Sequence, residues 1–516
     1  MLPAPSESSM AVSSSELAPL LSTIQSAILS TYLPPASSPI LPPTAVLQAA
    51  SSNLLQSIPT TGLGITPLIS HLFTDLLPAF NASSTSPHYY GFVTGGVTPA
   101  ALLADILVSL ADQNIQVHLP ADTLSTKIED VALSMLLELF HLEKTEWLGR
   151  TFTTGGTASN ILGLACGREH LLQDALKRAG YADAEASTGD LGILAACIDA
   201  GITGIQVLSA APHSSITKAA SILGIGRKQV HDVSWSDTPW EFDLEELEER
   251  LKSGQERGIV SIVVVGFGEV NTGRFTTGLG EIRRLLDKYG GWLHVDAAFG
   301  IFARVLVGAE GALAEVAGWA EGIELADSIA GDGHKLLNVP YDCGFFFTRT
   351  PAILQSTFVN TAPYLATPSA LDSIPSPLNI GLENSRRFRA LPVYATLAAY
   401  GSLGYRALVT RLILHARGIA RYIHHHPAYE LLPVENEAED EETTIRKVFM
   451  IVLFRAKEER VNKSLKERIN ATGKIYVSGT IWDGREAVRV AVGNWRVEDG
   501  EQGWEVVKEV LKEVLV

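Results

Sequence analysis

The sequence is poor in cysteine, in basic clusters and in long apolar runs, and each shortage excludes a class of protein. Its three cysteines among 516 residues lie far apart, which excludes a disulfide framework and gives no paired spacing for zinc. The net charge of -17 would repel nucleic-acid phosphates and anionic lipid, and no basic run offsets it. No apolar run reaches the roughly 18 residues of a membrane span, and no signal peptide is evident. We therefore predict a cytoplasmic protein without a nucleic-acid, membrane or metal partner.

Composition and length favour a large globular protein with more than one folded unit. Hydrophobic residues make up 46% and charged residues 19% of the chain, which is typical of globular proteins, and one core rarely suffices at this length. We expect an N-terminal arm over residues 1–86, a large domain over 87–400 and a small α+β domain over 401–516. Apolar patches at 17–33 and 46–58 predict helices in the arm that pack on the body or on a partner chain.

Short β-rich runs alternate with helical stretches through the middle of the chain. IQVLSA precedes SSITKAASILGI, IVSIVVVGF precedes LGEIRRLLDKYG, and WLHVDAAF follows. This alternation predicts an α/β domain with a mainly parallel sheet, preceded by helices that begin after Thr98 and near Lys127. Such sheets bind ligands at the carboxyl ends of their strands. Four chemically active residues follow these runs: His213, Glu269, Asp296 and Lys335.

The segment TFTTGGTASNILGL leads from an apolar strand through two glycines into a helix. Small residues at a helix N-terminus let backbone N–H groups approach a phosphate, and the helix dipole favours the same ligand. Gly155, Gly156 and Thr157 are therefore candidates for a phosphate site. A plain glycine turn before a helix is the alternative, and the segment alone leaves both open.

His213 and Asp296 each follow a predicted strand. In APHSSITKAAS the imidazole of His213 can stack on an aromatic ligand, although a capped or core histidine is the more ordinary role. In GWLHVDAAFG, Asp296 beside a pyridine nitrogen would raise the pKa of that nitrogen and keep the ring electron-withdrawing, and Ala298 leaves room for a flat ring. The alternatives are a helix cap or, with His294, half of a metal site, which no second ligand pair supports.

Lys335 is the predicted nucleophile. In ADSIAGDGHKLLNVPYDCG it follows His334 and precedes two leucines, and an apolar setting favours the neutral amine that forms imines. A solvated loop lysine is the ordinary alternative. Taken together, a phosphate cradle, a stacking imidazole, a ring-nitrogen partner and an imine-forming amine indicate pyridoxal 5'-phosphate (PLP) as the cofactor.

In this order the segments resemble the group II PLP-dependent amino-acid decarboxylases, which include the aromatic amino-acid and glutamate enzymes. The resemblance runs from about Pro87 to Trp495 and is carried by HVDAAF, ADSIAGDGHKLLNVPYDCG, SPHYYGFVTGG, TTGGTASN, APHSSITKA, GEVNTGRF and ENSRRFRALPVYATLAAYG. It implies the fold type I (PLP-dependent transferase) architecture, with a mainly parallel seven-stranded-type sheet and a smaller α+β C-terminal domain. It also implies a homodimer that removes the α-carboxylate of an L-amino acid to give the amine and carbon dioxide.

The resemblance assigns roles residue by residue. Lys335 matches the Schiff-base lysine, Asp296 the partner of the ring nitrogen, and His213 the group stacked on one face of the ring. Ala298 would lie against the other face. The remaining cofactor-binding matches are Gly155, Gly156, Thr157 and His334, and the substrate matches are His88 and Tyr90.

Two departures from the family pattern bear on the reaction. Between Cys343 and ENSRRF, aromatic members carry a mobile loop with a tyrosine that protonates the substrate carbon, whereas Tyr364 here matches a different family tyrosine. Without that acid the carbanion can react with oxygen, so an aldehyde synthase is one alternative. An aminotransferase-like enzyme and a catalytically silent scaffold are the others. Asp332 stands where many relatives have asparagine, and we expect its carboxylate to point away from the phosphate.

Overall fold

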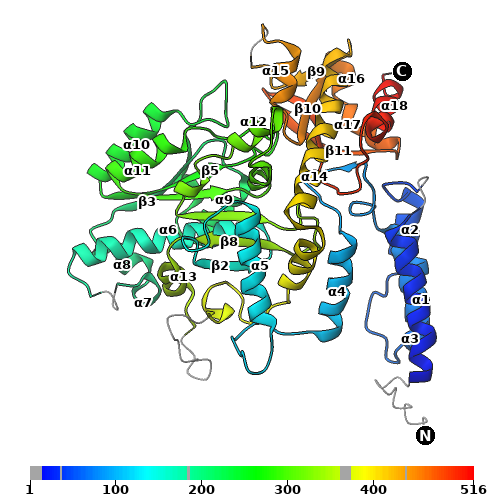
Figure 1. The fold of residues 1–516 in the computed structure, drawn as a ribbon, viewed down its shortest axis with the longest axis horizontal. Coiled ribbons are helices and arrows are strands. Elements are labelled where there is room, and N and C mark those ends of the chain that lie inside the picture. Colours follow the sequence, from blue (N-terminus) through cyan, green and yellow to red (C-terminus); the bar gives the residue numbers. More distant parts are fainter. Residues whose placement is uncertain (1–13, 35–37, 183–185, 361–373, 436–437, 516) are drawn as a thin grey trace.

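The computed structural model describes residues 14–34, 38–182, 186–360, 374–435 and 438–515 (Figure 1). They form a seven-stranded sheet with helices on both faces, a five-stranded sheet, and a helical arm at one side. Tyr364 lies outside the described residues. Among the helices that are described, none has the length and apolar character that crossing a membrane requires.

The larger sheet has the strand order β2-β8-β7-β6-β5-β3-β4. Strand β8 is antiparallel to both of its neighbours, and the other strands run in one direction. The predicted α/β fold with a mainly parallel sheet is therefore confirmed. The strands are β2 Gly149–Thr153, β3 Gly204–Ser209, β4 Val230–Asp232, β5 Ile259–Gly266, β6 Trp292–Asp296, β7 Ser328–Asp332 and β8 Gly344–Thr348.

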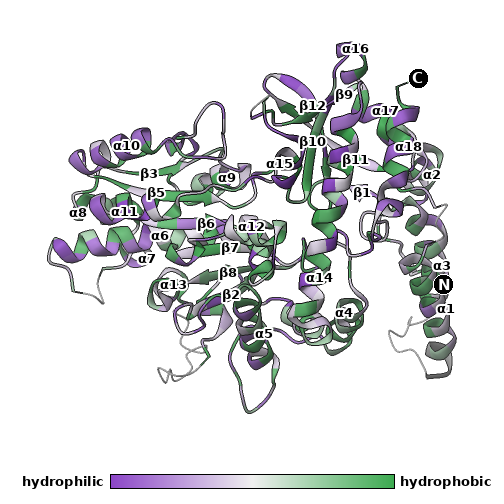
Figure 2. Ribbon diagram, turned by 45° about the horizontal axis from the view of Figure 1, so that its top comes forward, coloured by the Kyte–Doolittle hydropathy of each residue, from purple (hydrophilic) through white to green (hydrophobic). Residues whose placement is uncertain are grey.

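Two layers of helices cover this sheet, because its strands are apolar on both faces. On one face α6 (Gly156–Arg178) contacts β6, β7 and β8 and packs against α9 (Ser214–Ile222) and α13 (Pro351–Phe358). Small helices α7 (Thr188–Leu191) and α8 (Ile193–Asp199) extend this layer. The other face is covered by α5 Ser125–Leu139, α10 Leu244–Glu256, α11 Leu279–Tyr289 and α12 Ala312–Gly318. Figure 2 shows the resulting pattern, with hydrophilic outer surfaces on α10 and α11 over hydrophobic strands.

Helix α6 approaches the sheet closely because two of its residues are glycines. A Cβ at Gly163 would lie 2.3 Å from the ring of His294, and one at Gly167 would lie 2.7 Å from Trp292. Both values are far below van der Waals contact. The N-terminus of α6 is thereby held next to the carboxyl ends of β6 and β7.

The second sheet has the strand order β1-β11-β12-β10-β9. Its first strand comes from the segment SPHYYGF and pairs in parallel with β11, while the remaining pairs are antiparallel. The strands are β1 Tyr89–Tyr90, β9 Tyr429–Leu432, β10 Ile451–Ala456, β11 Tyr476–Trp482 and β12 Arg485–Ala491. Short helices accompany them: α15 Glu441–Arg446, α16 Glu459–Asn462, α17 Leu465–Ala471 and α18 Glu505–Glu513.

A single long element, α14 (Ala390–His425), joins the two sheets. Its first part packs on α4 (Pro99–Ala111) and α5, and its last part packs on β9, β10 and α15, with a non-helical kink at Gly401 between them. Helix α4 begins as predicted, because the side chain of Thr98 accepts from the Ala101 N–H. The arm, with α1 Ser14–Tyr32, α2 Thr44–Asn53 and α3 Ile65–Ser70, stands beside α4 in Figure 1.

Candidate active site

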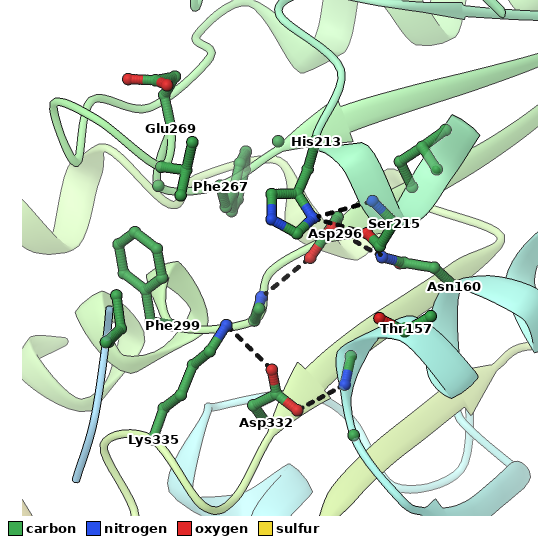
Figure 3. A pocket seen from close by; sticks show the side chains of 18 of the residues that line it. Thr157, Asn160, His213, Ser215, Phe267, Glu269, Asp296, Phe299, Asp332 and Lys335 are labelled. Carbon is green, nitrogen blue, oxygen red and sulfur yellow. Dashed lines mark hydrogen bonds and ion pairs between the residues drawn. The ribbon is translucent and has the colours of Figure 1, made fainter. Parts of the chain in front are cut away.

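A cavity of about 460 Å³ opens where the parallel strands of the large sheet end. The last residues of β3, β5, β6 and β7 line it, together with the first turns of α6 and α9 and residues from the second sheet. Its volume lies in the range typical of small-molecule sites. The predicted residues that line it are Gly155, Gly156, Thr157, His213, Asp296, Ala298, His334 and Lys335. Figure 3 labels Thr157, His213, Asp296 and Lys335 among them.

Asp296 ends β6 and is held by two donors. Asn160 donates to one carboxylate oxygen at 2.8 Å, and the backbone N–H of Ala298 donates to the other at 3.3 Å. The side chain of Asp296 is therefore fixed at the floor of the cavity, with acceptor capacity left for a further donor. This is the arrangement expected of a partner for a protonated ring nitrogen.

His213 lies between β3 and α9 and its ring faces the cavity (Figure 3). It is itself the N-cap of α9, because its Nδ1 accepts from the Ser215 N–H at 3.3 Å. The hydroxyl of Ser215 also contacts Nδ1 at 2.7 Å. The imidazole, rather than a serine side chain, therefore caps this helix. The contacts leave Nε2 directed away from the helix.

Asp332 requires a correction, since its carboxylate points into the site. One oxygen accepts from the backbone N–H of Gly156 at 2.5 Å, and the other lies 3.0 Å from the Nζ of Lys335 (Figure 3). His334 Nε2 lies 3.5 Å from the first oxygen. The N-terminus of α6 and the ammonium of Lys335 both attract the Asp332 carboxylate, and the expectation from the sequence did not include this attraction. Asp332 therefore sits at the predicted phosphate cradle.

The cradle itself is shaped by glycine. Gly155 has φ of 155° and caps α6, and a Cβ there would lie 3.0 Å from the His334 ring. A Cβ at Gly156 would lie 2.8 Å from a carboxylate oxygen of Asp332. Side chains at these two positions would fill the space in front of the α6 N-terminus. The His334 ring closes the cradle from the side, and its burial lowers the pKa of the imidazole.

The structure does not bring His88 and Tyr90 to the cavity, and this assignment needs correction. Pairing of β1 with β11 turns Tyr90 towards α14, where its hydroxyl lies 3.1 Å from Nε2 of His415 and 3.3 Å from Nδ1 of His88. The residues of this segment that do line the cavity are Phe92 and Val93. The motif reaches the cavity just after β1 ends, where Phe92 has a positive φ of 57° and the regular strand alternation is broken.

Sequence reasoning missed two polar residues at the cavity, Asn160 and Arg489. Asn160 is buried on the first turns of α6 and bonds Asp296, and only its place in TTGGTASN gave a signal. Arg489 is a buried residue of β12, and its Nε has no hydrogen-bond partner in the part of the chain that the structure describes. The signal in the sequence that could have indicated Arg489 is a single arginine within the otherwise apolar strand sequence VRVAV. Glu269 reaches the cavity, but Asn271 and Thr272 already occupy its carboxylate.

The donor set fits PLP. The flat ring would lie over Ala298 with its nitrogen at Asp296, its phosphate at the glycine cradle and its aldehyde carbon at Lys335. Both nitrogens of the neighbouring His294 are engaged by Asn160 and Ser328, which argues against a metal ligand there. The fold and this cavity together define a PLP-dependent enzyme of fold type I.

Comparison with known proteins then names the family. Residues 58–440 match the family described as pyridoxal-dependent decarboxylase conserved domain, so the chain belongs to that family. Tryptophan decarboxylase 1 of Oryza sativa subsp. japonica is 24% identical over 454 residues, covering 83% of this chain and 81% of that protein. Phenylacetaldehyde synthase of a Rosa hybrid cultivar is 23% identical, covering 83% and 81%. The chain is thus a PLP-dependent amino-acid decarboxylase, as the sequence predicted.

A solved structure supports the fold. Catharanthus roseus tryptophan decarboxylase, crystallised in complex with L-tryptophan, superposes with a TM-score of 0.78 at 18% identity, covering 98% of this chain and 99% of that one. At this identity the likeness concerns the fold. It accords with the predicted fold type I architecture.

Proposed function

We propose that this decarboxylase uses Lys335, Asp296 and His213 as its catalytic residues and releases the amine of an L-amino acid. The observation that supports this is their convergence on one cavity with the Gly155–Gly156–Thr157 loop. When bound, PLP supplies an electron sink for the electron pair left by the departing carboxylate. Everything else at the site is done by the protein's own side chains.

Each residue then has a stated task. Lys335 provides the amine that holds the cofactor, and Asp296 accepts a hydrogen bond from the ring nitrogen. His213 would pack on one face of the ring and Ala298 on the other, so that the ring is held between them. In its protonated form, His213 would also supply the proton that the substrate carbon takes up. The α6 N-terminus and His334 hold the phosphate end.

Arg489 is the proposed anchor for a substrate carboxylate. Burial lowers its pKa to about 10, so the guanidinium remains charged at neutral pH. Its Nη2 donates to the Phe92 carbonyl, its buried Nε has no hydrogen-bond partner among the described residues, and the residue lines the cavity. A charged arginine at a cavity is suited to a carboxylate. Phe92, Trp240 and Phe299 also line the cavity, and the Glu269 carboxylate lies close enough to interact electrostatically with Arg489.

The test is spectroscopic and chemical. Purified protein is titrated with PLP, wild type against Lys335→Ala, and then supplied with aromatic, acidic and basic L-amino acids while carbon dioxide, amine and hydrogen peroxide are measured. We expect a borohydride-reducible band near roughly 410–430 nm in the wild type only, as for a conjugated Schiff base. Absence of that band in the wild type would overturn the assignment.

An aldehyde synthase is the second candidate, because a relative covering most of the chain is named phenylacetaldehyde synthase. The same experiment separates the two reactions. Amine and carbon dioxide without peroxide identify simple decarboxylation, whereas aldehyde with ammonia and peroxide identifies the oxidative route. A keto acid would identify amino transfer.

We also propose a homodimer in the cytoplasm. Many apolar side chains of the arm are exposed in the single chain, among them Leu29, Leu54 and Ile58, and so are Leu107 and Leu110 of α4. Exposed apolar surface of this extent is characteristic of an association face. Light scattering on the purified protein measures the mass, and fractionation of the cells the location. The division at 86/87 and 400/401 is likewise a proposal, tested by limited proteolysis.

A further inference from the structure

A continuous hydrogen-bond network runs behind the cavity from β6 to α9. Asn160, on α6, lies at its centre: Nδ2 donates to Asp296 at 2.8 Å and to the Ser215 hydroxyl at 2.9 Å. Its Oδ1 lies 2.9 Å from Nε2 of His294. Asn160, Ser215 and His294 are all buried. Buried polar groups of this kind are informative because each donor must meet an acceptor.

The carboxylate of Asp296 fixes the orientation of Asn160. An ionised carboxylate only accepts, so the amide must present its NH2 group to Asp296 and its oxygen to His294. The opposite orientation would place two oxygens against each other at 2.8 Å. His294 therefore donates through Nε2. Its ring is neutral, since burial lowers its pKa to about 4, so Nδ1 is an acceptor.

The far end of the network agrees with this assignment. His294 Nδ1 lies 2.8 Å from the Ser328 hydroxyl, which also accepts from the indole N–H of Trp292 at 3.0 Å. An indole N–H can only donate, so the hydroxyl proton of Ser328 is available for Nδ1. Two groups with fixed roles, the indole and the carboxylate, thus bracket the network and demand the same direction.

The near end determines the histidine at the cavity. The Ser215 hydroxyl accepts from Asn160, which leaves its proton for Nδ1 of His213 at 2.7 Å. The Ser215 backbone N–H donates to the same nitrogen at 3.3 Å. Two donors on Nδ1 exclude a proton there in the neutral ring. The remaining nitrogen, Nε2, must carry the proton.

We propose that Asn160 is a positioning residue that, through Ser215, holds neutral His213 as its Nε2–H tautomer and so presents a hydrogen-bond donor to the substrate. The proposal rests on the proposed function for its consequence, but its structural part concerns the protein alone. One amide then orients both the ring-nitrogen carboxylate and the stacking imidazole. In this state Nε2–H can donate a hydrogen bond to a substrate carboxylate without prior rearrangement.

The direct test is a long-range ¹H–¹⁵N correlation spectrum of protein labelled with ¹⁵N-histidine, recorded without and with PLP. His213→Gln identifies the His213 signals by their loss. We expect Nε2–H with unprotonated Nδ1 for both His213 and His294 above neutral pH. A wild-type His213 signal with the proton on Nδ1 would overturn the proposal.

Variants then test the link through Asn160. Ser215→Ala should make the other tautomer of His213 detectable and lower kcat/KM about tenfold, with the Kd for PLP changed by less than about threefold; outer-shell contacts have effects of this size. Ser215→Thr keeps the hydroxyl and should restore both the Nε2–H tautomer of His213 and kcat/KM. Asn160→Ala should disturb His213 and also weaken PLP binding about tenfold, because Asp296 loses a donor. Unchanged His213 signals in both alanine variants would refute the proposal.

Ser159→Ala is the matched control. Ser159 lies next to Asn160 on α6 and is equally buried, but it bonds Thr153 and the Phe345 carbonyl, outside the network. It should lower Tm while leaving the histidine signals and the PLP band unchanged. Failure of the proposed function has a different result. If the wild type shows the predicted tautomer but neither a PLP band nor carbon dioxide, the hydrogen-bond network is supported and the proposed reaction is refuted.

Discussion

The two ends of the cofactor cavity are built differently. At the ring end, Asn160, Asp296 and Ser215 are joined by short bonds in which each donor has its acceptor. At the phosphate end, an ammonium and a backbone N–H share the carboxylate of Asp332. The polar groups of the ring end thus satisfy one another, whereas those of the phosphate end are paired with a carboxylate, which has the same sign of charge as a phosphate.

The ring end is preorganised by its own hydrogen bonds, whereas at the phosphate end a ligand would have to exchange with a protein carboxylate. A preformed polar network needs no reorganisation when the cofactor binds, because its groups are already ordered by folding. At the phosphate end, a phosphate bound at the cradle would compete with Asp332 for the Gly156 N–H, and the ion pair at Lys335 would have to break before the amine reacts. We therefore predict that cofactor loading and release of the lysine are coupled.

The largest expected effect comes from Lys335→Ala. It removes the amine at the junction of the two ends, so turnover should fall by more than about 10³-fold, as is typical when a nucleophile is lost. The absorbance band of the PLP-loaded protein should disappear as well. Lys288→Ala, which removes an exposed lysine paired with Glu248, is the control and should change neither. A band that survives in Lys335→Ala would place the cofactor on another amine.

Asp296→Asn breaks the ring end alone. The side chain keeps its shape but loses the charge that keeps the ring nitrogen protonated, so turnover should fall at least about 10²-fold. Its effect on the phosphate end should be small, so the phosphate-dependent part of PLP affinity should persist. Competition of inorganic phosphate with PLP measures that part. Full activity in this variant would remove Asp296 from the mechanism.

Asp332→Asn probes the phosphate end. It removes a negative charge beside the phosphate cradle and the ion pair to Lys335, and two like charges about 4 Å apart repel by about 1 kcal/mol even in bulk water. PLP should therefore bind at least about fivefold more tightly, with faster formation of the absorbance band. Titration of the apo protein gives both quantities. Weaker binding instead would mean that Asp332 supports the cradle.

The same comparison explains how much the sequence could predict. Periodicity and the GlyGlyThr, HVDAAF and HKLL segments predicted the sheet, the cradle, Asp296 and Lys335, because strand ends and helix starts are local features. Asn160 and Asp332 depend on which way a side chain points once α6 and β7 meet. That meeting is set by the close approach at Gly163, which no local pattern encodes.

The misplacement of His88 and Tyr90 has a similar cause. The motif SPHYYGF belongs to the edge of the second sheet, and its parallel pairing with β11 decides which side chains face the cavity. A contact between segments separated by several hundred residues fixes that register. Phe92 and Arg489, which meet across this junction, were therefore beyond reach from the sequence alone.

The smallest expected effect is on stability, and it distinguishes the ring-end network from an unrelated buried histidine. Burial lowers the pKa of His294 from 6.5 to about 4, so the unfolded chain binds a proton that the folded chain refuses between these values. The free energy of unfolding should therefore be highest above pH 6.5 and fall by up to about 3 kcal/mol as the pH drops towards 4. Urea unfolding at a series of pH values measures the slope.

His415, on α14, provides the comparison, because burial also lowers its pKa to about 4 but its ring bonds Tyr90 of β1, away from the cavity. His294→Gln and His415→Gln should each flatten the acid slope by a similar amount. Only His294→Gln should also disturb Asn160, and with it the PLP band and the His213 signal. If both substitutions changed the PLP band equally, the network behind Asp296 would not be the specific support for the ring end, and general loss of packing would explain the effect.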